Sequence, residues 1–390
     1  MRDVYWRGCR SENCARGAWI CVRNRTESGR RFRADGSITR PHLLLIVAIL
    51  AAAAIAAIWF RRRRPVVVPR PGAAATALAV PEASLSHPLK IIAYGDMRFT
   101  DPHETSATNP KVRRWLVDQI AAEKPDAVLL SGDVPWRGGE AADYEVYRSE
   151  TEVWRDGHLR IYPALGNHEF HGIDPLSTEQ KCLENWWNVF PELRGVRWYS
   201  VELGDSVYIL NLDSNASLLP GSPQILWLQG QLAHLPPAVK FVFFNLHHPP
   251  VVDFQENGDD SHNGRPNEKA LADFLSHAPA RDHAAFVVAA GHVHNYERFY
   301  QDGVVYLVSG GGGAKPRPIV RGQADLYQDT SFPNYHYVKF VQDGDRLDAT
   351  MVRVADPEAL TPSWQEKDHF QVGPQPTASA APGVRRGAYQ

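Results

Sequence analysis

The sequence of 390 residues contains little cysteine and no excess of charge of one sign. Of its 4 cysteines, Cys9, Cys14 and Cys21 lie near the N-terminus, at a spacing that matches no standard zinc motif. Four cysteines are too few for a disulfide framework, and Cys182 is expected to be an inert, packed thiol. The net charge of −2 provides no bulk attraction to nucleic acid, so no nucleic-acid partner is expected.

Long apolar runs are also scarce, and the one from Leu43 to Phe60 stands apart because it carries no charge. It is close to the roughly 17 to 20 residues that a membrane-spanning helix needs. We expect a single transmembrane helix at residues 42–60, with a cleaved signal peptide or a buried core helix as alternatives. Arginines flank both ends, so a single-pass membrane location is expected without a preferred side for the rest of the chain.

The segments around this run differ in composition from the remainder of the chain. Residues 1–41 are rich in arginine and lack lysine, which indicates a disordered tail or a misassigned translation start. Residues 61–87 are rich in proline, alanine and valine and resemble a linker, and residues 356–390 are expected to form a disordered tail. One folded domain is therefore expected at residues 88–355.

Within that domain, apolar strand-like runs alternate with segments of helical periodicity, which predicts an α/β fold with parallel strand pairs. Glycine and aspartate at positions 204 and 205 indicate a hairpin between residues 198–203 and 206–213. The other expected strands are 89–96, 126–130, 159–165, 240–246, 285–290, 304–308, 336–341 and 347–354, and the expected helices are 112–120, 178–190, 223–235 and 266–276.

Five of the expected strands stop at residues that are good metal ligands. Because ligands in open α/β sheets lie beyond the carboxyl ends of strands, these side chains are expected to share one site. The five junctions are Gly95-Asp96, Gly132-Asp133, Gly166-Asn167-His168-Glu169, His247-His248-Pro249 and Gly291-His292-Val293-His294-Asn295-Tyr296-Glu297-Arg298. Neutral imidazole and carboxylate side chains suit several first-row metal ions, so a metal site is predicted.

The order of these five motifs resembles that of the calcineurin-like metallophosphoesterases, and the last motif is similar to the purple acid phosphatase branch. The resemblance covers roughly residues 88 to 355. It implies two packed, mixed β-sheets flanked by helices in four layers.

The resemblance also implies a dinuclear centre whose ions are iron, manganese or zinc. Asp133 would bridge both ions. One ion would be completed by Asp96 and His294, and the other by Asn167, His247 and His292. His248 remains an alternative to His247. His168 would be the catalytic histidine that is not a ligand, and it would stabilise the transition state or protonate the leaving oxygen.

Two residues depart from the family pattern. Arg98 stands where many members have histidine, and Trp136 stands where purple acid phosphatases have a tyrosine ligand. The ion completed by Asp96 and His294 therefore lacks one protein ligand. It is expected to be held loosely, to take Asp101 or His103 as a ligand, or to carry an extra water. Arg98 is expected to bind the substrate phosphate, with a salt bridge to Asp101 or Glu104 as the alternative.

Other polar features are expected to have simpler roles. The glycine-rich segment 310–315 lacks the Gly-Lys-Ser/Thr ending of a nucleotide loop, so a turn lining the site is favoured. Trp186 and Trp187 are expected to pack in the core. Four further histidines match no motif and are interpreted as surface or structural residues: His171, His262, His277 and His283.

These expectations together describe a membrane-anchored metallophosphoesterase that hydrolyses a phosphomonoester by attack of a metal-bridging hydroxide, without a phosphoenzyme. One alternative is a phosphodiesterase or pyrophosphohydrolase acting on nucleotides or lipid head groups. Another is a non-catalytic envelope binding domain whose first metal site has decayed, as the residues at positions 98 and 136 suggest. The sequence does not indicate an oligomeric state.

Overall fold

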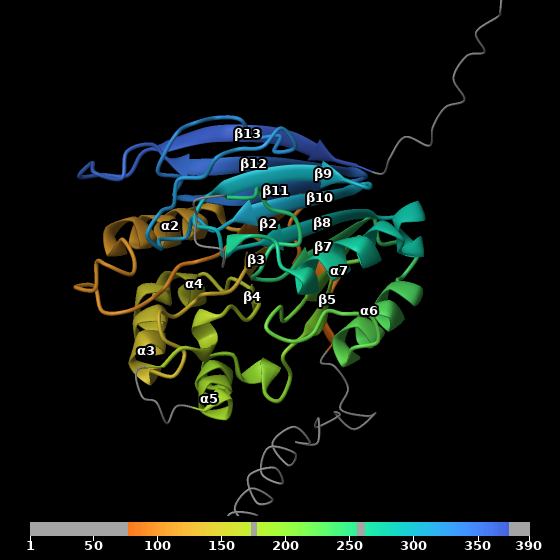
Figure 1. Cartoon of the computed structure of the whole chain (residues 1–390), viewed down its shortest axis with the longest axis horizontal. Helices are drawn as coiled ribbons and strands as arrows, with labels where there is room; N and C mark the ends of the chain where they lie inside the picture. Colours follow the sequence, from red (N-terminus) through yellow and green to blue (C-terminus); the bar gives the residue numbers. More distant parts are fainter. Residues whose placement is uncertain (1–76, 173–177, 256–261, 374–390) are drawn as a thin grey trace, which may run out of the picture. The chain divides into compact units, whose positions relative to one another are not determined.

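The computed structural model describes residues 77–172, 178–255 and 262–373. Two mixed sheets form the centre of this part of the chain (Figure 1). The first has seven strands in the order β1-β5-β6-β7-β8-β10-β9, and the second has six in the order β13-β12-β11-β2-β3-β4. The predicted pair of mixed sheets is therefore confirmed.

The first sheet is parallel over β6, β7, β8 and β10. The hairpin expected between residues 198 and 213 is confirmed as the antiparallel pair β5 and β6. Its strands are β1 (Ala77–Val80), β5 (Tyr199–Leu203), β6 (Val207–Asn211), β7 (Phe241–Asn245), β8 (Ala285–Ala290), β9 (Tyr296–Gln301) and β10 (Val304–Ser309).

The second sheet is parallel over β2, β3 and β4 and antiparallel over the rest. Its strands are β2 (Leu89–Tyr94), β3 (Ala127–Leu130), β4 (Ile161–Pro163), β11 (His336–Asp343), β12 (Arg346–Val354) and β13 (Trp364–Val372). Both sheets thus contain a block of parallel strands, and the carboxyl ends of such strands lie at one edge.

Helices cover the outer faces of the two sheets. In Figure 1, α2, α3 and α4 lie beside β2 to β4, whereas α6 and α7 lie beside the strands of the first sheet. The helices are α2 (Pro110–Glu123), α3 (Ala141–Glu150), α4 (Glu152–Asp156), α5 (Glu179–Val189), α6 (Pro223–Ala233) and α7 (Pro266–Ser276). The side chains of Asn109, Thr178 and Ser222 accept backbone N–H groups at the starts of α2, α5 and α6, as N-caps do.

Strand β7 contributes side chains to two hydrophobic cores. Phe241 and Phe243 face the second sheet, where Phe243 meets Phe340 of β11 with ring centroids 5.0 Å apart. Val242 and Phe244 point the other way, into the core formed with α6 and α7. Alternate residues of a strand face opposite sides, so burial on both faces favours apolar residues along the strand. The exception in β7 is its last residue, Asn245, whose buried side-chain amide donates to the Leu130 and Tyr162 carbonyls.

The domain boundaries expected at residues 88 and 355 are too narrow. Strand β1 lies in the segment interpreted as linker and pairs in parallel with β5. Strand β13 lies in the segment interpreted as a disordered tail and pairs with β12. Both are edge strands held by backbone hydrogen bonds: β1 has only four residues within an alanine-rich segment, and the outward side chains of β13 are polar, so neither resembles a central strand in sequence.

The expected transmembrane helix at residues 42–60 lies outside the described residues. Within the residues that the structure does describe, no helix combines the length and apolarity that crossing a bilayer requires.

The buried residue His336, at the start of β11, provides a test of this core. Its Nδ1 donates to the Asn334 carbonyl at 2.9 Å, and its Nε2 lies 3.0 Å from Ser309 Oγ. Burial lowers the pKa of His336 to about 4 from an ordinary value of 6.5. The unfolded chain therefore takes up a proton at a higher pH than the folded protein, and stability present above pH 6.5 is lost as the pH falls towards 4.

We expect His336→Gln to reduce this acid sensitivity. Between pH 7 and pH 4.5 the wild type should lose about 2 kcal/mol more unfolding free energy than the variant, because one pKa unit corresponds to about 1.4 kcal/mol. Urea unfolding at the two pH values measures the difference, with the exposed His234→Gln as control. Equal losses in the wild type and His336→Gln would contradict the assignment.

Candidate metal centre

The loops that follow the parallel strands of the two sheets meet at one place. The Gly95 N–H donates to the Ser309 carbonyl at 2.8 Å, which joins the loop after β2 to the end of β10. The Asp96 N–H donates to the Gly132 carbonyl at 3.1 Å, and the Gly291 N–H donates to the His247 carbonyl at 2.9 Å. These backbone bonds hold four ligand-bearing loops against one another.

Strained backbone geometry marks the same loops. Asp96, Arg98, Asp133 and His292 have φ values of 64°, 49°, 54° and 72°. Residues other than glycine rarely adopt these left-handed angles, which cost free energy and tend to occur at functional sites. These backbone angles direct the four side chains toward the place where the loops meet, and the surrounding backbone hydrogen bonds hold the loops in this conformation.

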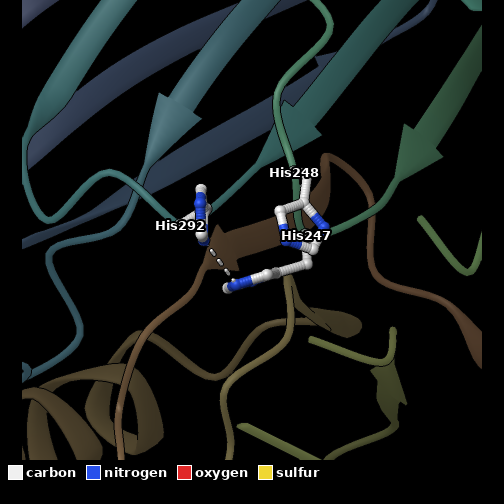
Figure 2. Close-up of side chains that lie close together, drawn as sticks. All are labelled: His247, His248 and His292. Atoms are coloured by element: carbon white, nitrogen blue, oxygen red, sulfur yellow. Dashed lines mark hydrogen bonds between the residues drawn. The ribbon is translucent and has the colours of Figure 1, made fainter. Parts of the chain in front are cut away.

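One group of ligand atoms gathers around His247. Its Nε2 lies 2.9 Å from Asn167 Oδ1 and 3.3 Å from Asp133 Oδ1. His292 Nδ1 lies 3.2 Å from the same nitrogen (Figure 2). The predicted ligands of one metal position are thereby brought together from four separate loops.

The second group is formed by Asp96 and His294. His294 Nε2 lies 3.4 Å from Asp96 Oδ1, and both atoms are buried without a hydrogen-bond partner among the residues that the structure describes. The other oxygen of Asp96 accepts the His292 N–H at 2.7 Å, which connects the two groups. Ligand atoms of Asp96, Asp133 and His247 all lie within 4.8 Å of one another.

Two histidines are held in the tautomer whose Nε2 lone pair can bind a cation. Nδ1 of His247 lies 2.9 Å from the Ser131 carbonyl, and Nδ1 of His294 lies 2.7 Å from the Lys315 carbonyl. A carbonyl only accepts, so Nδ1 must carry the proton and Nε2 presents a lone pair in the neutral ring. Each lone pair faces a carboxylate oxygen, and two acceptors that face each other in a buried site are stabilised by a positive ion.

The electrostatics of the site agree with this interpretation. Burial lowers the pKa of His294 to about 3, so the ring is neutral and able to coordinate at neutral pH. Burial raises the pKa of Asp96 well above its usual range. For Asp133, burial acts in the same direction, but the positive charge that His247 and His168 carry when protonated, together with that of Arg98, outweighs it and holds the pKa well below its usual range.

His168 lies beside this group without joining it. Its backbone N–H donates to Asp133 Oδ1 at 2.9 Å, and its Nδ1 donates to the Trp136 carbonyl at 2.7 Å. The Trp136 ring stacks on the imidazole with centroids 4.5 Å apart. The ring is thus fixed with Nε2 facing the site, 3.8 Å from Asp133 Oδ2. This placement is compatible with the catalytic role predicted for His168.

Glu169 has a supporting role that the sequence did not reveal, although it belongs to the third motif. Its buried carboxylate accepts backbone N–H groups from Asp133 at 3.0 Å, Val134 at 2.9 Å and Gly166 at 2.7 Å. The carboxylate therefore joins the second ligand loop to the third. It fixes the Asp133 backbone in the orientation that the site needs.

Arg98 has a different partner from those expected. Its Nε and Nη2 lie 3.3 and 3.1 Å from Asp133 Oδ2, so the salt bridge is to Asp133 and not to Asp101 or Glu104. Asp101 and His103, considered as substitute ligands, are exposed and pair with each other at 2.8 Å. Neither therefore contributes to the metal position in this structure.

The glycine-rich segment after β10 lines the site, as predicted. The Gly312 N–H donates to the Gly95 carbonyl at 2.9 Å. A Cβ atom at Gly310 would lie 2.1 Å from the Val293 carbonyl and 2.8 Å from Asp96 Oδ2, so only glycine fits there. Trp186 is fully buried, as expected for a core residue, and Trp187 is partly buried against the same core.

Two further histidines lie at the site: His248, which the sequence left as an alternative ligand to His247, and His262, which no motif marked. Figure 2 shows His248 beside His247 and facing His292, and ligand atoms of these three histidines lie within 4.8 Å of one another. Nδ1 of His248 lies 2.8 Å from Ser214 Oγ. His262 is buried and stacks on His292 with ring centroids 4.8 Å apart, so of the two interpretations, surface or structural, the structure excludes the surface one.

Comparisons of this chain with a protein-family model and with solved structures agree with the fold described above. A family model described as calcineurin-like phosphoesterase matches residues 90–310, which is more than half of the chain. The protein therefore belongs to the calcineurin-like phosphoesterase family. No curated protein matches the chain.

Two solved structures are similar at low identity. Purple acid phosphatase PPD1 from seeds of yellow lupin (Lupinus luteus) is 19% identical with a TM-score of 0.56, and the alignment covers 73% of this chain and 53% of that chain. The chain thus spans about half the length of that phosphatase. The structure of PhoD is 11% identical with a TM-score of 0.52, covering 73% of this chain and 70% of that chain. Both similarities concern the fold.

Proposed function

We propose that this protein is a metal-dependent phosphoester hydrolase that acts on phosphomonoesters. The observation that carries the proposal is the pair of Nε2 lone pairs, on His247 and His294, that face Asp133 and Asp96 in a buried site. Family membership supports it, because the calcineurin-like phosphoesterase model matches residues 90–310, the part of the chain that contains these ligands. The family also implies a dinuclear centre, whose metals we propose to be iron, manganese or zinc.

The proposed ligands would form two metal positions. Asn167, His247 and His292 would hold one metal, Asp96 and His294 would hold the other, and Asp133 would contribute an oxygen to each. When bound, such metals neutralise phosphate charge and lower the pKa of water. Asn167 is a neutral ligand and leaves more positive charge for the anionic ester. Glu169 and the Ser131 and Lys315 carbonyls hold the ligands in place.

His168 would act on the ester as a donor that is not itself a metal ligand. Burial lowers the pKa of its ring to about 3, and a nearby phosphate anion would raise that pKa. Once protonated, Nε2 would donate to a phosphoryl oxygen or to the leaving oxygen, while Nδ1 stays on the Trp136 carbonyl. Arg98 uses Nε and Nη2 on Asp133, so its Nη1 would be the donor available to the substrate phosphate.

The expected substrate preference can be measured directly. Purified protein supplied with manganese, iron or zinc should hydrolyse p-nitrophenyl phosphate with a kcat/KM at least about tenfold above that for bis(p-nitrophenyl) phosphate, a difference of about 1.4 kcal/mol in transition-state binding. A preference for the bis ester would favour the phosphodiesterase alternative. No hydrolysis of either ester with any of these metals would favour a binding domain.

A further inference from the structure

The position of Arg98 bears on how the two metal positions are filled. The guanidinium lies against one oxygen of Asp133, and only 12% of the Arg98 side chain is exposed. Its Cζ lies 5.0 Å from the centroid of the Trp136 ring, which itself stacks on His168. The charged group is thus confined between a carboxylate and an aromatic face, where guanidinium groups are well accommodated.

The backbone holds Arg98 in this place. The Arg98 N–H donates to the Asp133 carbonyl at 2.9 Å, and the Phe99 N–H donates to the Val134 carbonyl at 2.7 Å. The Trp136 N–H donates to the Phe99 carbonyl at 3.0 Å. Because these bonds join the loops after β2 and β3, residue 98 lies next to Asp133, and the Arg98 side chain reaches the Asp133 carboxylate.

The two oxygens of Asp133 have separate surroundings. Oδ1 accepts the His168 N–H at 2.9 Å and lies 3.3 Å from His247 Nε2, on the side of the Asn167 group. Oδ2 faces Arg98, with Nη2 at 3.1 Å. A metal held by Asp96 and His294 would need an oxygen of Asp133 to complete its protein ligands. Because Oδ1 lies beside His247, Oδ2 is the oxygen left for that metal, and the guanidinium holds it.

We propose that Arg98 competes with metal for Asp133 Oδ2, and that the Asp96–His294 position therefore binds a metal ion more weakly than the Asn167–His247–His292 position. The inference rests on the proposed function, because it assumes that both ligand groups bind metal. A guanidinium keeps its charge at all accessible pH values and has no lone pair to offer as a ligand. It repels a nearby cation, and it supplies part of the positive charge that a second metal would bring to Asp133.

The test is a titration of the metal-free, full-length protein with Mn²⁺, followed by calorimetry and by elemental analysis after dialysis. The wild type should bind one equivalent tightly and a second at least about tenfold more weakly, a difference of about 1.4 kcal/mol. Arg98→His and Arg98→Met should each tighten the second equivalent by at least about tenfold. Arg98→Lys retains the charge and should keep the second equivalent weak.

Electron paramagnetic resonance gives a readout that does not depend on activity. At one equivalent of Mn²⁺, the wild type should show the signal of isolated Mn²⁺, whereas Arg98→His should already show spin-coupled pairs. Arg114→His is the matched control, because Arg114 is an exposed arginine of α2 whose partner is Glu150, and it should match the wild type.

Each outcome distinguishes the inference from the function on which it rests. Two equally tight equivalents in the wild type would overturn the inference and leave the hydrolase proposal intact, and this result needs no variant to fold. An unchanged second equivalent in Arg98→Met, with unaltered thermal unfolding, would overturn it as well. A wild type that binds no Mn²⁺, zinc or iron would overturn the proposed function itself.

Discussion

Replacing His292 with alanine is expected to remove the metal from the Asn167–His247–His292 position and to abolish hydrolysis. Bound metal contributes several kcal/mol of transition-state stabilisation, so kcat/KM should fall at least about a thousandfold. The His292 N–H that donates to Asp96 Oδ2 belongs to the backbone and persists in the variant. The loss would therefore report the imidazole and not a rearranged loop.

Elemental analysis and ester hydrolysis on the same preparation measure both effects. His234→Ala is the matched control, because this histidine is exposed at the end of α6 and its Nδ1 contacts the local Gly230 carbonyl. The control should retain the metal and the activity. A His292→Ala protein that keeps wild-type metal content would contradict the ligand assignment.

His168→Ala is expected to have the opposite pattern, with metal retained and turnover lost. The backbone N–H of residue 168 still donates to Asp133 Oδ1 in the variant, so the ligand geometry is preserved. The imidazole is lost as a proton donor, and kcat should fall about 100- to 1,000-fold, the usual range for a general acid or base. Metal content and KM should change much less than kcat.

Steady-state kinetics and elemental analysis of the two alanine variants test this division of roles together. If the His168 imidazole only filled space, His168→Phe, which also stacks on Trp136, would restore the turnover lost in His168→Ala. If His168→Ala lost metal to the same extent as His292→Ala, His168 would be a ligand and its assigned role would be wrong.

The central strands and the ligand loops were predictable because their signals are local. Strands β7 and β8 are mostly apolar runs; β8 is followed directly by Gly291 and His292, and β7 ends two residues before His247. Burial on both faces requires such runs, and a sharp turn at the strand end requires glycine or a strained residue. The sequence alone therefore located the loops that carry Asp96, Asp133 and His292.

The edge strands β9 and β13 were not predicted, because their sequences lack such a local signal. Strand β9 directly follows the ligand loop, and β13 is largely polar, with glutamate, lysine and aspartate among its residues. Their formation depends on a neighbouring strand that supplies backbone hydrogen bonds, so the apolar pattern is weak. The contact of Arg98 with Asp133 was missed similarly, because it depends on two loops running side by side.

The contribution of His262 also required the fold. It lies 30 residues before His292 in the sequence, and its stacking on that ring arises only when the segment before α7 returns to the site. No motif in the sequence marks it. The membrane span at residues 42–60 stays a prediction, since those residues lie outside the described part of the chain.

The most direct test of the metal centre is anomalous diffraction from crystals of the full-length protein grown with Mn²⁺. We expect an anomalous peak about 2.0–2.3 Å from His247 Nε2 and from oxygens of Asn167 and Asp133, distances typical of first-row metals with nitrogen and oxygen ligands. A second, weaker peak is expected next to Asp96 and His294. Well-ordered crystals without a peak at either position, under metal concentrations that support hydrolysis, would contradict the account.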